Sequence, residues 1–348
     1  MAGAIVVTGA FLPPVQARVK GLAVLAEAIG LPYPRPFAPL VRRLDASFAG
    51  VTGDVYVPDR PAPAVVLIPG AARLGKNDPR AVRLALAVAR AGRVVLVPDL
   101  ILAQRRFDPR DLDRLVRSVL ALARHPLVRG PVSLLGISYG GSFALVAAAD
   151  PRLAGRLAQV AVFGAYWDLV GVIQAVTTGV TLVGGRAIPW EGHPTAREIL
   201  EEQALALAPE ASRDDLRLAL EGRTDPASLE RDARALFDLL TNRDPGRTAT
   251  LADRLAPRAT ELLTRFSPAA VADRIRAPVI AMHARGDPAV PYAESLRLAH
   301  GLPGARVVTV GSFRHVDFQG SGPGAWVGAA GDLWSAWRFS SWLLEAQE

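Results

Sequence analysis

Short apolar segments alternate with longer helix-like segments over most of this chain of 348 residues, and this alternation limits the fold more than any other feature. Apolar segments of this length are typical of strands that are buried on both faces of a sheet. Helices between them supply the crossover connections that parallel strands need. The expected strands are Val65–Ile68, Val94–Val97, Val132–Leu135, Gln159–Phe163, Val279–Met282 and Arg306–Val310. The sequence therefore predicts an α/β fold with a mostly parallel central sheet that is flanked by helices.

The alternation stops after Trp167 and resumes only at Val279. From Asp168 to Ala277 the sequence has helical periodicity and no convincing strand. The helices expected in this stretch are Thr195–Ala208, Arg213–Glu221, Ala227–Leu240 and Thr248–Arg265. The other expected elements are a hairpin at Ala46–Val57 and helices at Val15–Ile29, Ala81–Ala91, Leu112–Ala123, Ser142–Ala149 and about Trp326–Leu344. We therefore expect an α/β core at 44–167 and 278–348, an all-helical insertion at 168–277, and an N-terminal amphipathic helix with its connector at 1–43.

One expected strand ends in the pentapeptide Gly136-Ile137-Ser138-Tyr139-Gly140, and a helix-like segment of small residues follows it. The arrangement predicts a strand, a sharp turn and a helix, with Ser138 at the apex. The two glycines suit such a turn, because one lets strand and helix approach closely and the other leaves room where a side chain would clash. A serine hydroxyl becomes a good nucleophile when a turn exposes it and a base takes its proton. We interpret Ser138 as a candidate nucleophile, with an incidental serine in a Gly-rich turn as the alternative.

Histidine is the usual base for a serine nucleophile, and the chain contains only 5 histidines. His315 follows the last expected strand by a short loop, and loops after parallel strands gather at the edge of the sheet where ligands bind. The others lie at a helix end, in the insertion, at the end of a strand and at the end of a surface helix: His125, His193, His283 and His300. Elimination therefore favours His315 as the base.

A catalytic histidine also needs a carboxylate that orients the imidazole and stabilises its charged form. Asp287 follows the strand Val279–Met282 in a loop whose glycine and prolines would hold a fixed shape. Asp168 follows the preceding strand and could reach the same histidine, whereas Asp317 lies too near His315 in sequence for an easy approach. We favour Asp287 and keep Asp168 as the alternative.

Acyl transfer further needs N–H donors for the oxyanion that develops in the transition state. The backbone amide of Tyr139 comes directly after the candidate nucleophile. A second amide is expected from the loop Pro69-Gly70-Ala71-Ala72, in which Ala71 is the better placed residue. Small residues suit a role of the backbone, although they suit any tight loop as well.

Composition excludes several kinds of site. Because the chain has no cysteine, it forms no disulfide, thiolate nucleophile or cysteine-based zinc site. Its net charge is +7, but only Lys20 and Lys76 are lysines and the arginines are scattered among acids. A nucleic-acid footprint would need a basic block or basic residues interleaved with aromatics. We therefore expect no nucleic-acid partner.

The sequence also bears on the membrane. No run of 18 apolar residues occurs, so no spanning segment is expected. The first residues, Met1–Leu12, lack the basic region of a signal peptide, which favours a cytoplasmic protein. Leu169–Gly185 is uncharged throughout but is interrupted by glycine, threonine and glutamine. We interpret it as a buried or pocket-lining segment.

The candidate nucleophile, acid and base, with the loops around them, resemble those of the α/β-hydrolase fold family. Their order along the chain is that of the family: Ser138, Asp287, His315. The resemblance covers about residues 45–346, and the insertion at 168–277 stands where family members carry a helical cap over the active site. Two loops depart from the family pattern, since the acid loop has Ala284 where a glycine is often found and the oxyanion loop has Pro69 in place of a histidine.

The resemblance implies a serine hydrolase that cleaves an ester or a related acyl bond. Ser138 would attack, His315 would transfer the proton, Asp287 would stay ionised, and water would release the acyl-enzyme. No metal or organic cofactor is needed, the expected partner is a hydrophobic small-molecule ester, and a homodimer is left open. Thioester hydrolysis, acyl transfer or peptidase action by the same triad, and lipid binding without turnover, are the alternatives.

A cap would set the specificity. The segment Leu169–Gly185 would either form an apolar wall above Ser138 or pack the cap onto the sheet. Three aromatic residues would either line a pocket or fill the core: Tyr166, Trp167 and Trp190. Three tryptophans at helical spacing near the C-terminus are expected in the core: Trp326, Trp334 and Trp337.

Overall fold

The computed structural model describes residues 13–31, 39–315, 317–318 and 329–345. An eight-stranded sheet forms its centre, in the order β1-β2-β4-β3-β5-β6-β9-β10. The strands are β1 (Val41–Phe48), β2 (Val51–Pro58), β3 (Ala62–Ile68), β4 (Val94–Pro98), β5 (Val128–Ile137), β6 (Leu157–Phe163), β9 (Val279–Ala284) and β10 (Arg306–Val310). Strands β1 and β2 pair antiparallel, as do β2 and β4, and every other neighbouring pair is parallel. The mostly parallel sheet and the hairpin are therefore confirmed.

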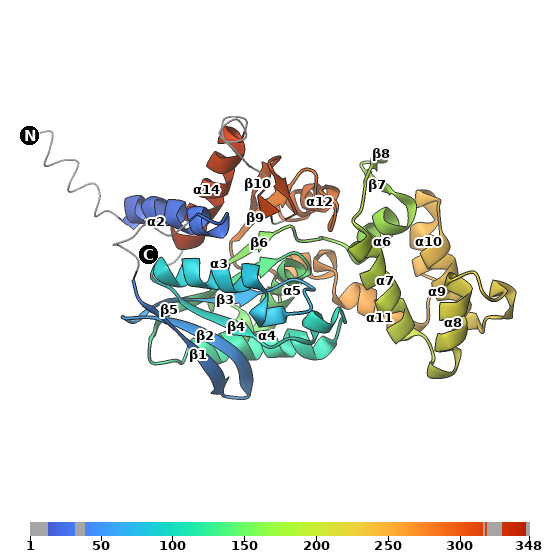
Figure 1. Cartoon of the computed structure of the whole chain (residues 1–348), viewed down its shortest axis with the longest axis horizontal. Coiled ribbons are helices and arrows are strands. Elements are labelled where there is room, and N and C mark those ends of the chain that lie inside the picture. Colours follow the sequence, from blue (N-terminus) through green and yellow to red (C-terminus); the bar gives the residue numbers. More distant parts are fainter. Residues whose placement is uncertain (1–12, 32–38, 316, 319–328, 346–348) are drawn as a thin grey trace, which may run out of the picture.

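Helices cover both faces of this sheet (Figure 1). Alternate residues of β3 point to opposite faces, so Val66 and Ile68 join one apolar core while Val65 and Leu67 join the other. The first core is covered by α4 (Pro109–Leu122), α5 (Tyr139–Ala148) and α12 (Ala293–Gly301). The second is covered by α2 (Pro13–Ala28), α3 (Pro79–Arg90) and α14 (Ala330–Glu345).

The N-terminal helix α2 packs along the C-terminal helix α14 (Figure 1). The Trp337 indole N–H donates to the Arg18 carbonyl at 2.8 Å. Gly21 permits the close approach, because a Cβ there would lie 2.8 Å from the Ser341 backbone nitrogen. Trp334 does not fill the core as expected, since it is 58% exposed and its ring lies tilted against that of Trp337, whereas Trp337 packs against the second core. Trp326 lies outside the described residues.

The stretch after Asp168 forms a second group of helices with an apolar cluster of its own (Figure 1). These helices are α6 (Leu169–Thr178), α7 (Pro194–Leu207), α8 (Arg213–Leu220), α9 (Arg231–Thr241), α10 (Thr248–Ala252) and α11 (Pro257–Arg265). No helix in the described part of the chain is long and apolar enough to cross a membrane.

Two expectations for this insertion were wrong. It is not all-helical, because β7 (Val180–Val183) and β8 (Arg186–Pro189) pair as an antiparallel hairpin. The turn residues Gly184 and Gly185 both have positive φ, 56° and 78°, as a tight two-residue hairpin turn requires. The single helix expected at Thr248–Arg265 is broken into α10 and α11, because Pro257 has no N–H to donate and starts a new helix instead.

Candidate active site

Ser138 lies between the end of β5 and the start of α5, with φ 55° and ψ −132°. Positive φ is uncommon outside glycine and persists only when the surroundings fix it. Here the Ser138 amide donates to the Phe163 carbonyl of β6 at 2.7 Å. Gly140 lets the turn pack against the neighbouring loop, because a Cβ there would lie 2.3 Å from the Pro69 carbonyl oxygen. The sharp turn expected from the pentapeptide is present.

Asp287 and His315 meet at the same edge of the sheet. Asp287 follows β9, and His315 follows the short strand β11 (Phe313–Arg314). The His315 Nδ1 lies 2.7 Å from the Asp287 Oδ2. Gly164 faces this pair, because a Cβ there would lie 3.2 Å from both Asp287 Oδ2 and His315 Cε1. Since Gly164 directly follows the residue that holds the Ser138 amide, the serine turn and the acid–imidazole pair are neighbours.

The Asp287 carboxylate is almost completely enclosed, with 2% exposure. Its Oδ1 accepts the backbone N–H groups of Ala289 at 2.8 Å and Val290 at 3.0 Å. Burial alone would raise the pKa of Asp287, but the facing His315 and His283 side chains outweigh burial and hold that pKa well below its usual range. An ionised carboxylate only accepts hydrogen bonds, so the His315 Nδ1 carries a proton. In neutral His315, the Nε2 lone pair is then free to accept another proton.

The rival carboxylate Asp168 has a different role. It caps α6, accepting the Val170 N–H at 3.4 Å and the Ser267 hydroxyl at 3.1 Å. His283, which elimination set aside, is fully buried and places its Nε2 3.3 Å from Asp287 Oδ2. The sequence carried one signal for this contact, a histidine at the end of a strand four residues before the acid.

The two candidate oxyanion donors come from segments next to Ser138. Tyr139 is the first residue of α5, so its N–H has no acceptor within the helix and lies at the positive end of the helix dipole. Ala71 follows Gly70, where a Cβ would lie 2.9 Å from the Ser138 Cβ. Strands β3 and β5 are parallel neighbours, and the chain leaves them in opposite directions along the sheet. Crevices for ligands form at such switch points.

The three aromatic pocket candidates lie in different surroundings. Tyr166 is fully buried, and its hydroxyl donates to the Phe266 carbonyl at 3.0 Å. Trp167 is 7% exposed and packs against Gly301 at the end of α12. Trp190 donates its indole N–H to the Asp287 carbonyl at 2.8 Å. Tyr166 and Trp167 thus belong to the core, whereas Trp190 contacts the backbone of the acid loop.

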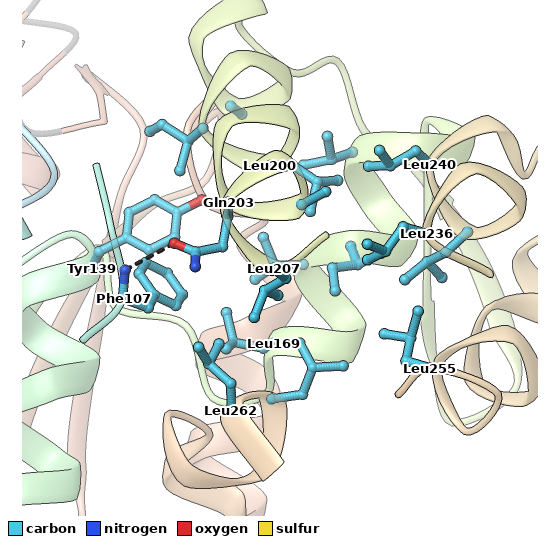
Figure 2. A pocket seen from close by; sticks show the side chains of 18 residues that line it. Phe107, Tyr139, Leu169, Leu200, Gln203, Leu207, Leu236, Leu240, Leu255 and Leu262 are labelled. Carbon is cyan, nitrogen blue, oxygen red and sulfur yellow. Dashed lines mark hydrogen bonds between the residues drawn. The ribbon is translucent and has the colours of Figure 1, made fainter. Parts of the chain in front are cut away.

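A cavity of about 60 Å³ lies between the core and the insertion (Figure 2). Its walls are mainly leucine, isoleucine and valine side chains of α6, α7, α9 and α11, and the described lining residues include no charged side chain. Phe107 and Tyr139 bound it on the core side. The polar Gln203 is engaged, because its Oε1 accepts the Phe107 N–H at 2.8 Å. The expectation that Leu169–Gly185 lines a pocket holds for α6, which contributes Leu169 and three further residues.

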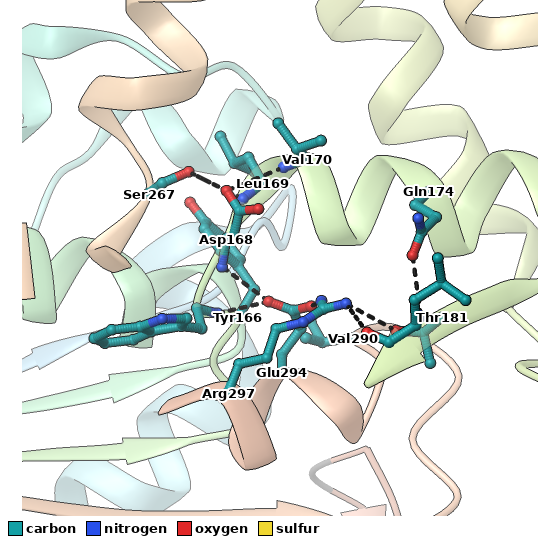
Figure 3. A network of polar contacts seen from close by, with 12 residues as sticks. Tyr166, Asp168, Leu169, Val170, Gln174, Thr181, Ser267, Val290, Glu294 and Arg297 are labelled. Carbon is teal, nitrogen blue, oxygen red and sulfur yellow. Dashed lines mark hydrogen bonds and ion pairs between the residues drawn. The ribbon is translucent and has the colours of Figure 1, made fainter. Parts of the chain in front are cut away.

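A polar network fixes the point where the chain enters the insertion (Figure 3). Glu294 of α12 is fully buried, and its Oε2 accepts the N–H groups of Trp167 at 3.0 Å and Asp168 at 2.8 Å. Its Oε1 pairs with Arg297, which also donates to the Leu182 carbonyl in the hairpin. Burial raises the pKa of Glu294, and Arg297 opposes this rise.

Among the described residues, no group of three or more His, Asp or Glu side chains could hold a metal ion.

Comparison with known proteins gives the fold. No family model and no curated protein matches the chain. Among solved structures it is similar to the alpha/beta hydrolase GrgF from Penicillium sp. sh18, with a TM-score of 0.52, 17% identity, and coverage of 88% of this chain and 99% of that one. It is also similar to 2,6-dihydroxy-pseudo-oxynicotine hydrolase, with a TM-score of 0.51, 15% identity, and coverage of 89% and 68%. With its mostly parallel sheet and the serine turn between β5 and α5, the chain has the α/β-hydrolase fold.

Proposed function

We propose that this protein is a serine hydrolase that cleaves carboxylic ester bonds through an acyl-enzyme. The observation that carries this proposal is the 2.7 Å contact between Asp287 Oδ2 and His315 Nδ1 beside a serine held at φ 55°. A structural hydrogen bond alone would not need a strained serine turn and a buried anion at one edge of the sheet.

In this mechanism the Ser138 hydroxyl attacks the ester carbonyl and the His315 Nε2 takes its proton. His315 then gives that proton to the leaving alcohol, and a water molecule activated in the same way releases the acid. Asp287 stays ionised and stabilises the imidazolium, as its lowered pKa allows. The amides of Tyr139 and Ala71 stabilise the oxyanion.

We further propose that residues 168–277 act as a cap and that the substrate is apolar. The cavity beside Tyr139 is lined by uncharged residues, and its volume of about 60 Å³ leaves room for a small apolar group. A short aliphatic group fits this space without a change in the cap. Each methylene group buried there contributes about 0.8 kcal/mol, or roughly fourfold in kcat/KM, until the cavity is full. The preference should therefore peak at short acyl chains and fall for long ones.

A series of p-nitrophenyl esters from acetate to palmitate tests the proposal, together with a serine-reactive phosphonate. The phosphonate should label Ser138, and Ser138→Ala should lose ester turnover. Ser142→Ala is the matched control. Ser142 lies one helical turn away, and its hydroxyl donates to the Tyr166 carbonyl at 2.8 Å, so its loss should affect stability rather than turnover per folded molecule.

The outcomes separate the alternatives. Faster turnover of thioesters, transfer to added alcohols, or cleavage of peptides would replace the ester assignment but keep the triad. Retained activity in Ser138→Ala would refute the nucleophile. A folded wild-type protein that neither reacts with the phosphonate nor turns over any of these substrates would refute hydrolysis and favour a lipid-binding protein.

A further inference from the structure

Two imidazoles, rather than one, contact the buried carboxylate of Asp287. The Oδ2 atom lies 2.7 Å from His315 Nδ1 and 3.3 Å from His283 Nε2. The Oδ1 atom is occupied by the amides of Ala289 and Val290. The loop amides thus hold Oδ1. His283, in the strand that precedes Asp287, contacts Oδ2, which is also the oxygen that faces His315.

His283 is well placed to hold this loop. It lies in β9, which pairs with a parallel strand on each side, and it is 0% exposed. Its Nδ1 lies 2.6 Å from the Ser295 Oγ in α12, and its Nε2 lies 3.1 Å from the Val290 carbonyl oxygen. The imidazole therefore connects the helix α12 and the strand β9 to both ends of the segment Asp287–Val290.

The proton on His283 can be assigned from its partners. The Nε2 faces a carbonyl oxygen and an ionised carboxylate oxygen, and both of these only accept hydrogen bonds. The Nε2 must therefore carry a proton, which is directed to Val290 O at 3.1 Å, while Asp287 Oδ2 lies 3.3 Å away as a second, longer acceptor contact. The Ser295 hydroxyl can either donate to Nδ1 or accept from it. The Nε2–H group of His283 can thus serve as the donor toward Asp287 whether the imidazole is neutral or protonated.

We propose that His283 is a positioning residue for the catalytic acid. Its Nε2–H fixes the rotation of the Asp287 carboxylate so that Oδ2 points at His315 Nδ1. This inference rests on the proposed function, since positioning matters only if Asp287 and His315 act on Ser138. His283 itself touches neither the substrate nor Ser138 in this role.

Two amide variants separate positioning from a purely structural role. In His283→Gln the side-chain amide nitrogen can reach the position of Nε2, so it can still donate toward Asp287. In His283→Asn the shorter amide reaches only the position of Nδ1, so it keeps the Ser295 contact and loses the Asp287 contact. We expect His283→Gln to keep kcat within about threefold of wild type. His283→Asn should lose about tenfold to a hundredfold in kcat with KM nearly unchanged, as for other groups that orient a catalytic side chain.

A spectroscopic readout does not depend on turnover. The proton on His315 Nδ1 should give a far-downfield NMR resonance through its short bond to Oδ2. That resonance should persist in His283→Gln and weaken or shift in His283→Asn. Gln159→Leu is the structural control. Like His283, Gln159 is a fully buried polar residue of the central sheet, but it lies in β6 and donates to the Leu343 carbonyl at 2.7 Å instead of contacting Asp287.

The result would overturn the proposal if both amide variants had equal kcat per folded molecule and the same downfield resonance. Equal losses in kcat that track the lowered melting temperature, as in Gln159→Leu, would likewise assign His283 a structural role only. If the wild-type protein hydrolyses no ester and reacts with no phosphonate, the proposed function fails, and the resonance alone then decides whether His283 orients Asp287.

Discussion

Replacing Glu294 by alanine should strongly destabilise the protein, although the residue lies outside the catalytic set. The carboxylate is fully buried, and alanine would remove the acceptor for two amides, those of Trp167 and Asp168 (Figure 3). It would also leave Arg297, whose side chain is 23% exposed, without its carboxylate partner. Breaking the pair in this way costs more than the net contribution of the pair, because a partly buried charge is left without its partner.

The magnitude can be converted into a melting temperature. Removal of one partner of a buried ion pair costs about 3–5 kcal/mol. The entropy of unfolding is about 2.1 cal/mol/K per residue, or roughly 0.7 kcal/mol/K for 348 residues. Glu294→Ala should therefore lower Tm by about 4–7 °C. Thermal unfolding followed by circular dichroism measures this shift.

An ion pair with an exposed carboxylate gives the control, since its arginine, Arg105, also pairs with Glu202. Glu198 is 55% exposed and pairs with Arg105 at 3.0 Å. Exposed pairs contribute about 0–1 kcal/mol, so Glu198→Ala should change Tm by no more than about 1.5 °C. In the double variant Glu294→Ala/Arg297→Ala the loss should be smaller than the sum of the two single losses, since the unpaired charge is gone. Equal Tm values for Glu294→Ala and Glu198→Ala would refute the reasoning.

Three further changes test other parts of the site. Gly140→Ala should prevent folding or remove activity, because its Cβ would meet the Pro69 carbonyl oxygen at 2.3 Å, whereas Gly304→Ala, with open space around it, should be neutral in thermal unfolding and ester assays. In Asp287→Asn the free energy of unfolding, measured with urea, should fall less on acidification than in the wild type. The lowered pKa of Asp287 stabilises the folded protein above the unfolded pKa of about 3.9, and this contribution is lost as pH falls through the folded pKa. Trp190→Phe should cost about 1 kcal/mol in urea unfolding through the lost bond to the Asp287 carbonyl, and an unchanged midpoint would contradict that contact.

The parts of the fold that depend on local sequence were predicted well. Apolar strands such as Val94–Val97 and the turn around Ser138 have patterns that nearly determine their structure, because a buried strand and a tight turn leave few alternatives. The hairpin in the insertion was missed because its strands are only four residues long, and the first of them lies within the uncharged segment Leu169–Gly185. The pair Gly184-Gly185 was a usable signal, since two consecutive glycines suit a hairpin turn.

The site was predictable to the extent that it follows the topology of the sheet. Asp287 and His315 come after neighbouring strands, so a parallel sheet brings both to one edge without any long-range information. The contacts of His283 and Trp190 with the acid loop could not be read in this way. They depend on which side of a strand faces the loop and on how the insertion docks, and both are set by tertiary packing rather than by periodicity.

The docking of the insertion also links the two halves of the site. On one side, Arg73, two residues after Ala71, pairs with Glu202 of α7 at 2.6 Å. On the other side, the Trp190 indole and the His193 amide donate to the Asp287 and Pro288 carbonyls. Any movement of the insertion away from the core must therefore release contacts next to the oxyanion loop and next to the acid loop together. If the proposed function holds, the insertion is a structural part of the proposed catalytic site, so changes within it should alter kcat as well as the choice of substrate.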